Sequence, residues 1–419
     1  MAPRRKTTIF RRASRALQQQ IGSSNITKAI QVGNVKLCYA SYTSAGSDGN
    51  GDKENQDCLA IEVLRHERDR DAEPVMFFGV FDGHGEHGGT VAALAAEQLP
   101  QFVGELHPQA GDPEAALLAG FASTQQFLLQ QSGLDCGMSG CTAVAALLVN
   151  DSLLVANAGD SRCLAGRFEG NHELVAYELS NDHTPALLHE ANRILASGGR
   201  IAPLEYAGRN VGPPRVWERN ADQPGLCITR SLGDTQAKRL GVTHVPELAT
   251  FKLTSGDRYL ALVSDGITEF MGSQEIIEKV HKWATAGTMP HEVARRLVRE
   301  ARTRWKELGG EGIVDDCTAV VAYLVFDEEG EGEDDEQVGS KKKKKKKKKS
   351  HRAKGGSSAA HGNVASGGGD DGDVQQKQQK QGGRRWALQQ QASALWTTVR
   401  EALAVLKREN ASKQKQVDV

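Results

Sequence analysis

Four aspartates stand where an apolar segment of this sequence begins or ends, and a fifth lies in the stretch Glu54-Asn55-Gln56-Asp57, which makes these five the first candidates for chemistry. Glycine adjoins three of the five. An isolated Asp-Gly or Gly-Asp pair is most often a turn signal, so each pair alone indicates only a turn. Because the pairing recurs beside several predicted strands, the repetition favours a shared carboxylate site. The five are Asp57, Asp82, Asp160, Asp265 and Asp315.

Carboxylates gathered in this way favour hard divalent cations. Central strands of a sheet deliver their terminal residues to one edge, so several of these carboxylates can converge there, and glycine leaves room for metal-bound water. Carboxylate and water oxygens are the ligands that Mg²⁺ and Mn²⁺ select. The sequence offers no His and Cys cluster as a zinc alternative. We therefore expect Mg²⁺ or Mn²⁺ as the cofactor.

His84 follows Asp82 by two positions, in the stretch Phe81-Asp82-Gly83-His84-Gly85. Taken alone, it is equally well interpreted as a turn histidine without a role. Beside a metal-binding carboxylate it is well placed to donate a proton, because an imidazole with a pKa near ~6.5 exchanges protons around neutrality.

The elements that must position these residues alternate between short apolar runs and helical patterns. Runs rich in β-branched or aromatic residues predict strands over 75–81, 142–149, 153–157, 259–263 and 317–326. Apolar residues at three- and four-residue steps predict helices over 86–99, 113–131, 186–197, 273–283 and 290–308. We expect one mixed α and β domain.

Composition divides the 419 residues into an acidic middle and two basic ends, although the net charge is only −1. An acidic fold argues against nucleic-acid binding by the fold itself. Residues 341–349 are all lysine, and this part of the chain is too polar to bury a core. The predicted parts are a basic, disordered extension over 1–32, a folded domain over 33–326, a disordered acidic, lysine-rich and glycine-rich linker over 327–383, an amphipathic helix over 384–409 and a disordered end over 410–419.

Location is indicated by the cysteines and by the N-terminal composition. Seven cysteines without a C-x-x-C pair are typical of reduced packing residues, which favours the cytoplasm or nucleus. No apolar run is long enough for a transmembrane segment. The first residues are basic, contain serine and lack acids up to Asp48, so an organelle transit peptide stays an open alternative.

Eight ordered motifs resemble those of the metal-dependent type 2C protein serine/threonine phosphatases, over about residues 33–326. The stretches PRVW at 214–217 and PGL at 224–226 are similar to plant and algal members in particular. The motifs are NQD at 55–57, FGVFDGHG at 78–85, SGCTA at 139–143, ANAGDSR at 156–162, DHTP at 182–185, TRSLGD at 229–234, SDG at 264–266 and DDCT at 315–318.

The resemblance implies an α+β fold in which two mainly antiparallel sheets pack face to face, with helices on both outer faces. It implies a signalling hydrolase that dephosphorylates phosphoserine and phosphothreonine by direct attack of a metal-activated water, without a phosphoenzyme. By position, Asp57, Asp82, Asp265 and Asp315 would bind two metal ions with the Gly83 carbonyl. His84 would protonate the leaving group, and Asp160 would bind a third, weaker metal ion.

Two departures from the family pattern concern the substrate phosphate and the third metal ion. Where the family often has a phosphate-binding arginine, this chain has Asp52, and Lys53 is the nearest basic residue. Lys53 is the candidate for that role, although a lysine lacks the bidentate fork of arginine. Glu269 stands where many members carry a further aspartate for the third metal ion. The segment 198–225 matches the flap beside the family's active site.

Two other classes of function stay open at this point. A catalytically weak pseudo-phosphatase could serve as a binding module. Such a protein would be recognised by the loss of a metal-binding aspartate, and all four aspartates assigned to the two metal ions are present. The lysine run could attract anionic lipid or RNA, yet it lacks the interleaved aromatics of a specific reader. We expect a monomer with phosphoprotein substrates, a protein partner for the 384–409 helix and no specific nucleic acid.

Overall fold

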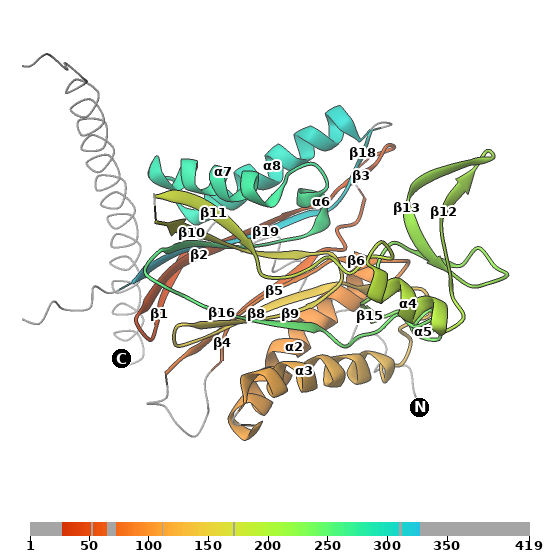
Figure 1. Cartoon of the computed structure of the whole chain (residues 1–419), viewed down its shortest axis with the longest axis horizontal. Coiled ribbons are helices and arrows are strands. Elements are labelled where there is room, and N and C mark those ends of the chain that lie inside the picture. The colour runs from red at the N-terminus through yellow and green to blue at the C-terminus, as the bar shows by residue number, and fades with distance from the viewer. Residues whose placement is uncertain are drawn as a thin grey trace, which may run out of the picture. The chain divides into compact units, whose positions relative to one another are not determined.

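Two antiparallel sheets, packed face to face, form the centre of the molecule in a computed structural model (Figure 1). The structure describes residues 27–51, 53–64, 73–110, 112–170, 172–309 and 312–326. The first sheet has the strand order β1 (Lys28–Val32), β2 (Val35–Ser44), β19 (Cys317–Phe326), β17 (Asp257–Val263), β10 (Arg162–Glu169) and β11 (Glu173–Glu178). The second has the order β16 (Glu247–Lys252), β9 (Ser152–Ala158), β8 (Ala143–Val149), β5 (Val75–Phe81) and β4 (Cys58–Leu64).

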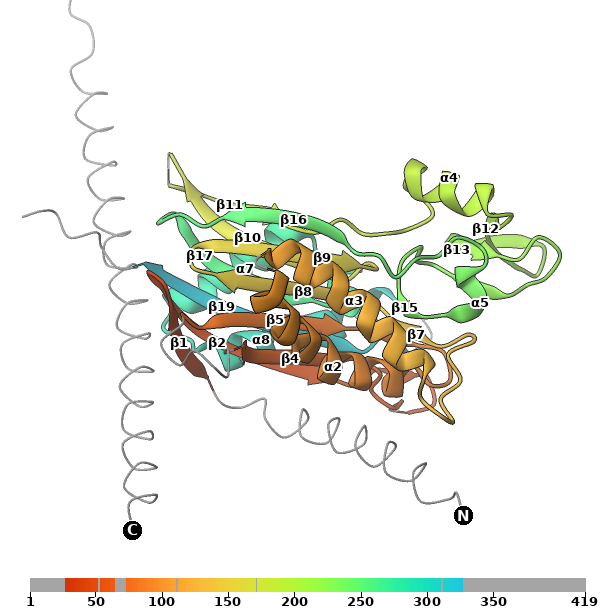
Figure 2. The same cartoon turned by 90° about the horizontal axis from the view of Figure 1, so that it is seen from below.

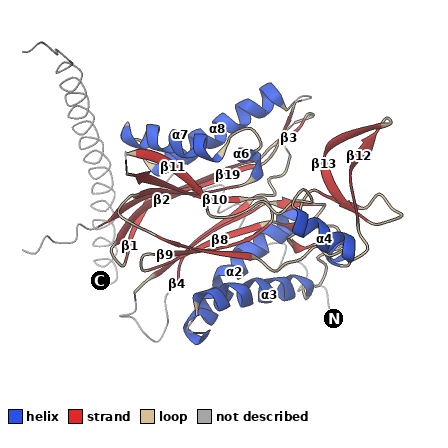
Figure 3. Cartoon of the chain, in the orientation of Figure 1, coloured by secondary structure: helices blue, strands red, loops and turns tan. Residues whose placement is uncertain are grey.

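Helices cover the outer face of each sheet, so the described residues form four layers (Figure 3). Helices α7 (Ser273–Thr285) and α8 (Pro290–Leu308) pack on the first sheet. Helices α2 (Gly88–Ala110) and α3 (Pro113–Leu129) form the layer outside the second, with α2 directly on β4 and β5. The α+β sandwich implied by the resemblance is therefore confirmed. Among the described residues, no helix is long and apolar enough to cross a bilayer.

The central strands are continuous apolar runs because both of their faces are buried. In β5, Phe77 and Phe81 pack in the helix-covered core, whereas Met76, Phe78 and Val80 pack in the core between the sheets. The same alternation divides β17 and β19 between the two cores that they separate. Successive side chains of these strands point to opposite faces, and this alternation fixes the register that brings the strand ends together.

Smaller elements lie at the strand ends near the predicted carboxylates. A separate antiparallel sheet, which we call the flap, consists of β12 (Arg200–Tyr206), β13 (Arg209–Trp217) and β14 (Pro224–Leu226). The flap lies beside α4 (Leu188–Ala196) and α5 (Thr235–Lys238), away from the helices on the sheet faces (Figure 2). The others are β6 (Gly83–His84), β7 (Gly140–Cys141), β15 (Leu232–Gly233), β3 (Ser47–Asp48), β18 (Ile313–Val314) and α6 (Asp265–Thr268).

Two sequence-based boundaries need correction. The extension predicted over 1–32 includes β1, which pairs with β2 and buries Val32 completely. The helix predicted over 86–99 continues through Pro100 to Ala110, because Phe102 and Val103 pack against α3. The linker over 327–383, the helix over 384–409, the end over 410–419 and most of the N-terminal extension lie outside the described residues.

Candidate active site

The strand registers place the five predicted aspartates at the same end of the sandwich. Asp82 follows β5 and Asp57 precedes β4, where Cys58 pairs with Phe81. Asp265 follows β17, and Asp315 precedes β19, whose Ala319 pairs with Val263. Asp160 follows β9 and precedes β10, the neighbour of β17. Segments far apart in the chain thus contribute one carboxylate each to a common region.

Burial and mutual repulsion make ionisation of these carboxyls costly. Burial, followed by the charge of Asp316, raises the pKa of Asp57 to about 8. Burial and the charge of Asp315 raise the pKa of Asp265 to about 6. The pKa of Asp82 is raised well above its usual value by burial and by Asp57 and Asp265, and Asp82 is hydrogen-bonded to Asp265. A cation placed among them would remove this cost.

The donor set fits divalent cations. Asp57 is 1% exposed; Ser264 Oγ donates to its Oδ2 over 2.7 Å, whereas its Oδ1 is buried without a hydrogen-bond partner. Asp265 Oδ1 is likewise buried and unpartnered. The side chains of the described residues do not form a ready-made cluster of three or more metal-ligating groups. The fit therefore rests on orphaned carboxylate oxygens, which are the ligand type of Mg²⁺ and Mn²⁺.

Gly83 lies where no side chain can be accommodated. A Cβ atom at this position would lie 2.5 Å from the Gly88 carbonyl oxygen and 2.7 Å from that of Gln56. The backbone of residues 82–84 is thereby held against the segment that precedes Asp57. The predicted role of the Gly83 carbonyl as a metal ligand stays a prediction.

His84 is paired with a residue to which the sequence alone assigned no role. Its Nε2 lies 2.8 Å from Oδ2 of Asp234, a fully buried residue 150 positions away. Ser231 Oγ donates to the same carboxylate oxygen over 2.5 Å, and Lys238 Nζ donates to the Ser231 carbonyl over 2.7 Å. Burial alone would raise the pKa of Asp234, but the facing His84 lowers it, so Asp234 stays ionised. Asp234 fixes the orientation of the imidazole.

Lys53 lies at the carboxylate cluster, and its predicted phosphate-binding role stays a prediction. Its Nζ donates to Asp315 Oδ1 over 2.9 Å and lies 3.3 Å from Asp316 Oδ2. Burial alone would lower the pKa of Lys53, but these two charges raise it, so the ammonium stays protonated. Asp316 also accepts from the backbone N–H groups of Gly46 and Gln56 over 2.6 and 2.9 Å. Asp316, which sequence reasoning missed, thereby ties three segments of the site together.

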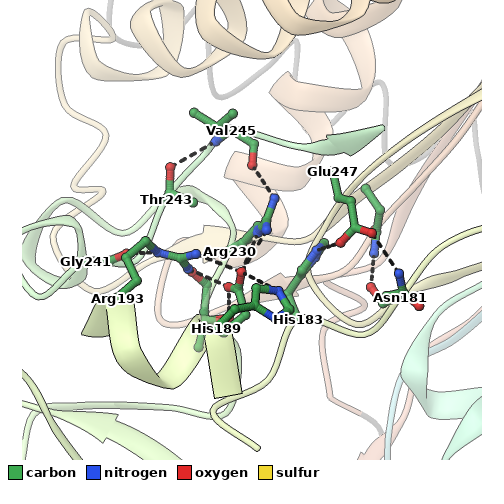
Figure 4. Close-up of polar contacts among 12 residues, drawn as sticks. Asn181, His183, His189, Arg193, Arg230, Gly241, Thr243, Val245 and Glu247 are labelled. Carbon is green, nitrogen blue, oxygen red and sulfur yellow. Dashed lines mark hydrogen bonds and ion pairs between the residues drawn. The ribbon is translucent and has the colours of Figure 1, made fainter. Parts of the chain in front are cut away.

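A second polar network joins α4 to Thr229 and Arg230, in the motif that also contains Asp234 (Figure 4). The completely buried Glu190 accepts hydrogen bonds from the guanidinium groups of Arg193 and Arg230 and from the Thr229 hydroxyl. Burial alone would raise the pKa of Glu190, but these donors hold it far below its usual range. The TRSLGD motif signalled this segment, but no sequence pattern identified its partner on α4.

Comparisons with known proteins agree on one family. The family model described as protein phosphatase 2C matches residues 44–307. A probable protein phosphatase 2C from Arabidopsis thaliana is 30% identical over 73% of this chain and 88% of its own length. Another from the same plant is 31% identical over 59% of this chain and 76% of its own length.

A solved structure supports the fold. The serine-threonine phosphatase 2C from Toxoplasma gondii matches with a TM-score of 0.57 and 20% identity, over 71% of this chain and 98% of that chain. The relatives are named as phosphatases, and nothing in these comparisons supports a binding module that has lost catalysis.

Proposed function

The chain belongs to the protein phosphatase 2C family and is a protein serine/threonine phosphatase, and from this premise we propose which residues carry its metal-dependent reaction. Asp57, Asp82, Asp265, Asp315 and the Gly83 carbonyl hold two Mg²⁺ or Mn²⁺ ions. Asp160 holds a third, weaker one. The observation that carries this proposal is the pair of buried, unpartnered oxygens on Asp57 and Asp265, within a cluster whose pKa values are raised.

When bound, divalent cations supply an activated water molecule and neutralise the phosphoryl oxygens. The chain's own residues do the rest. His84 donates a proton to the serine or threonine oxygen that leaves, since an alkoxide is a poor leaving group. Asp234, fixed by Ser231, holds the imidazole in place. Hydrolysis proceeds by direct attack of water, without a phosphoenzyme.

Lys53 supplies a positive charge for the substrate phosphate in place of the family's arginine. Its side chain is 32% exposed, and Asp315 and Asp316 hold its ammonium. A single ammonium attracts a phosphate as a point charge and does not impose a bidentate geometry. Substrate choice would then depend more on the cations and on the flap than on this residue.

Phosphoproteins are the substrates of this site, and the flap lies where they would contact the protein. Its reduced cysteines favour the cytoplasm or nucleus, and we propose that the enzyme is a monomer. We propose a protein partner for the segment 384–409, which lies outside the described residues.

A phosphate-release assay tests the reaction. Phosphoserine and phosphothreonine peptides are compared with a phosphotyrosine peptide of the same sequence, in EDTA, in Mg²⁺ and in Mn²⁺. The proposal predicts release from the first two only when a cation is present, and much less from the third. Equal release in EDTA and in Mn²⁺ would rule out the metal-dependent mechanism.

A further inference from the structure

Both peptide groups that flank Gly159 are bound by one residue, His183. The Gly159 N–H donates to Nδ1 of the His183 ring over 3.3 Å. The His183 backbone N–H donates to the Gly159 carbonyl over 2.9 Å. Asn157 Nδ2 also donates to this carbonyl, over 3.1 Å. The two peptide planes that determine the direction of the chain into Asp160 are therefore set by contacts from other residues.

The His183 ring is itself held in one orientation. It is completely buried, and its Nε2 lies 2.9 Å from Glu247 Oε2 on β16 (Figure 4). Because Nδ1 accepts from Gly159, Nε2 must carry the proton and donate to Glu247. Asn181 donates to the other Glu247 oxygen over 2.7 Å, which fixes the carboxylate. We call Glu247, His183 and Gly159, joined by these hydrogen bonds, the clamp. It connects the edge strand of the second sheet to the residue before Asp160.

Gly159 needs such a clamp because it has no side chain to restrict its backbone. Its φ is +128°, and a Cβ there would lie 2.6 Å from Thr142, so a larger residue is excluded. The Asp160 carboxyl that follows lies at the same end of the sandwich as Asp265, because β10, which begins just after Asp160, pairs with β17, which ends just before Asp265. Its direction matters, because a shift of the backbone would carry the carboxylate away from Asp265.

We propose that His183 is a positioning residue that sets the Gly159 backbone and thereby aims the Asp160 carboxylate at the metal site. The inference rests on the proposed role of Asp160 as a ligand of the weaker cation. It assigns a function to the DHTP motif that neither the fold nor the ligand set explains. Groups that orient a metal ligand typically change metal affinity 10–100-fold when they are lost.

Two substitutions separate the two ring nitrogens of His183 in the full-length protein. His183→Asn keeps an acceptor at the position of Nδ1 but loses the bond to Glu247, whereas His183→Gln keeps a donor near Nε2 but loses the acceptor for Gly159. The first readout is amide hydrogen exchange of residues 158–161 in EDTA, which needs neither metal nor turnover. The second is the Mn²⁺ concentration that gives half-maximal phosphate release.

The expected result is asymmetric. His183→Gln accelerates exchange at Gly159 at least tenfold and raises the half-activating Mn²⁺ concentration about tenfold, while turnover at saturating Mn²⁺ falls less than about threefold. In His183→Asn, exchange at Gly159 and the half-activating Mn²⁺ concentration both stay close to those of the unmodified protein. The matched control is His281→Gln, which changes a partly buried histidine on α7 that contacts Tyr259 over 2.9 Å, and it should alter neither readout.

Equal behaviour of the two His183 variants, or unchanged exchange in His183→Gln, would overturn the positioning role. If His183→Gln does not fold, Glu247→Ala and Glu247→Gln give the same comparison, because only the second keeps an acceptor for Nε2. The alanine variant must then accelerate exchange at Gly159 more than the glutamine variant, or the inference is wrong. Failure of the proposed function would instead appear as metal-independent turnover in the unmodified protein, with the exchange result unaffected.

Discussion

The pairing of His84 with Asp234 gives the general-acid role a specific kinetic signature. His84→Gln removes the proton donor, so hydrolysis of an alkyl phosphate such as a phosphoserine peptide should slow by about 100-fold or more. An aryl phosphate should slow much less, since an aryl oxide leaves without protonation. The check is kcat for both esters at saturating Mn²⁺. Equal losses on the two esters would remove His84 from this role.

The raised pKa of Asp265 predicts how the metal-free protein responds to pH. A carboxyl whose pKa is about 6 when folded and near ~4 when unfolded favours the folded state least at high pH, where it must ionise inside the protein. Asp265→Asn removes this cost. In EDTA, its free energy of unfolding should therefore gain about 1–2 kcal/mol relative to the unmodified protein between pH 5 and pH 7.5.

Denaturant unfolding of both proteins across this range measures the gain. Titrating groups distant from Asp265 cancel in the difference, and relief of Asp82, whose pKa Asp265 also raises, adds to the gain. A constant difference would show that Asp265 is not strained in the absence of metal. Saturating Mn²⁺ should reverse the order, because the cation stabilises only the intact carboxylate cluster.

Sequence reasoning could find the aspartates but not their supports. Asp82, Asp160, Asp265 and Asp315 each adjoin a predicted or observed apolar strand, which is a local signal, whereas Asp57 stands out only through the NQD motif. The partner of His84 lies 150 positions away, on a buried turn, and its pairing depends on how β15 meets β7. No periodicity in a single sequence records such a contact.

At the scale of secondary-structure elements, α4 is joined to the Thr229–Arg230 segment through one buried carboxylate, Glu190. Glu190→Gln would leave the two guanidinium groups of Arg193 and Arg230 without their counter-charge in a buried environment. Breaking such a buried pair costs about 3–5 kcal/mol of stability. Hydrogen exchange should rise in α4 and in the Thr229–Arg230 segment before it rises in β5. Exchange that increases uniformly across the molecule would argue against a local anchor.

The limits of element prediction follow from packing. The five predicted strands lie in the two sheets, because continuous apolar runs mark strands buried on both faces. The structure extends α2 past Pro100, since contacts of Phe102 with Phe127 outweigh the local preference of proline to end a helix. Strand β1 was missed because only Val32 of its five residues is fully buried.

At the scale of the whole molecule, the site is complete within the folded domain. A protein ending at Phe326 retains every residue assigned to catalysis, and Phe326 is the last residue of β19. Its turnover of an aryl phosphate and its melting temperature should match those of the full chain, while its location or choice of protein substrate changes. A large fall in turnover or in melting temperature would show that the 384–409 segment belongs to the catalytic domain.

The most direct test of the central claim is Mn²⁺-dependent phosphate release by Asp82→Asn and Asp265→Asn. Each substitution removes a negative ligand from a site whose cations carry most of the charge that develops during the reaction. Circular dichroism and thermal melting in EDTA verify that each variant is folded. The account predicts that release from a phosphothreonine peptide at saturating Mn²⁺ falls more than about 100-fold in both variants. Turnover like that of the unmodified protein in either folded variant would contradict it.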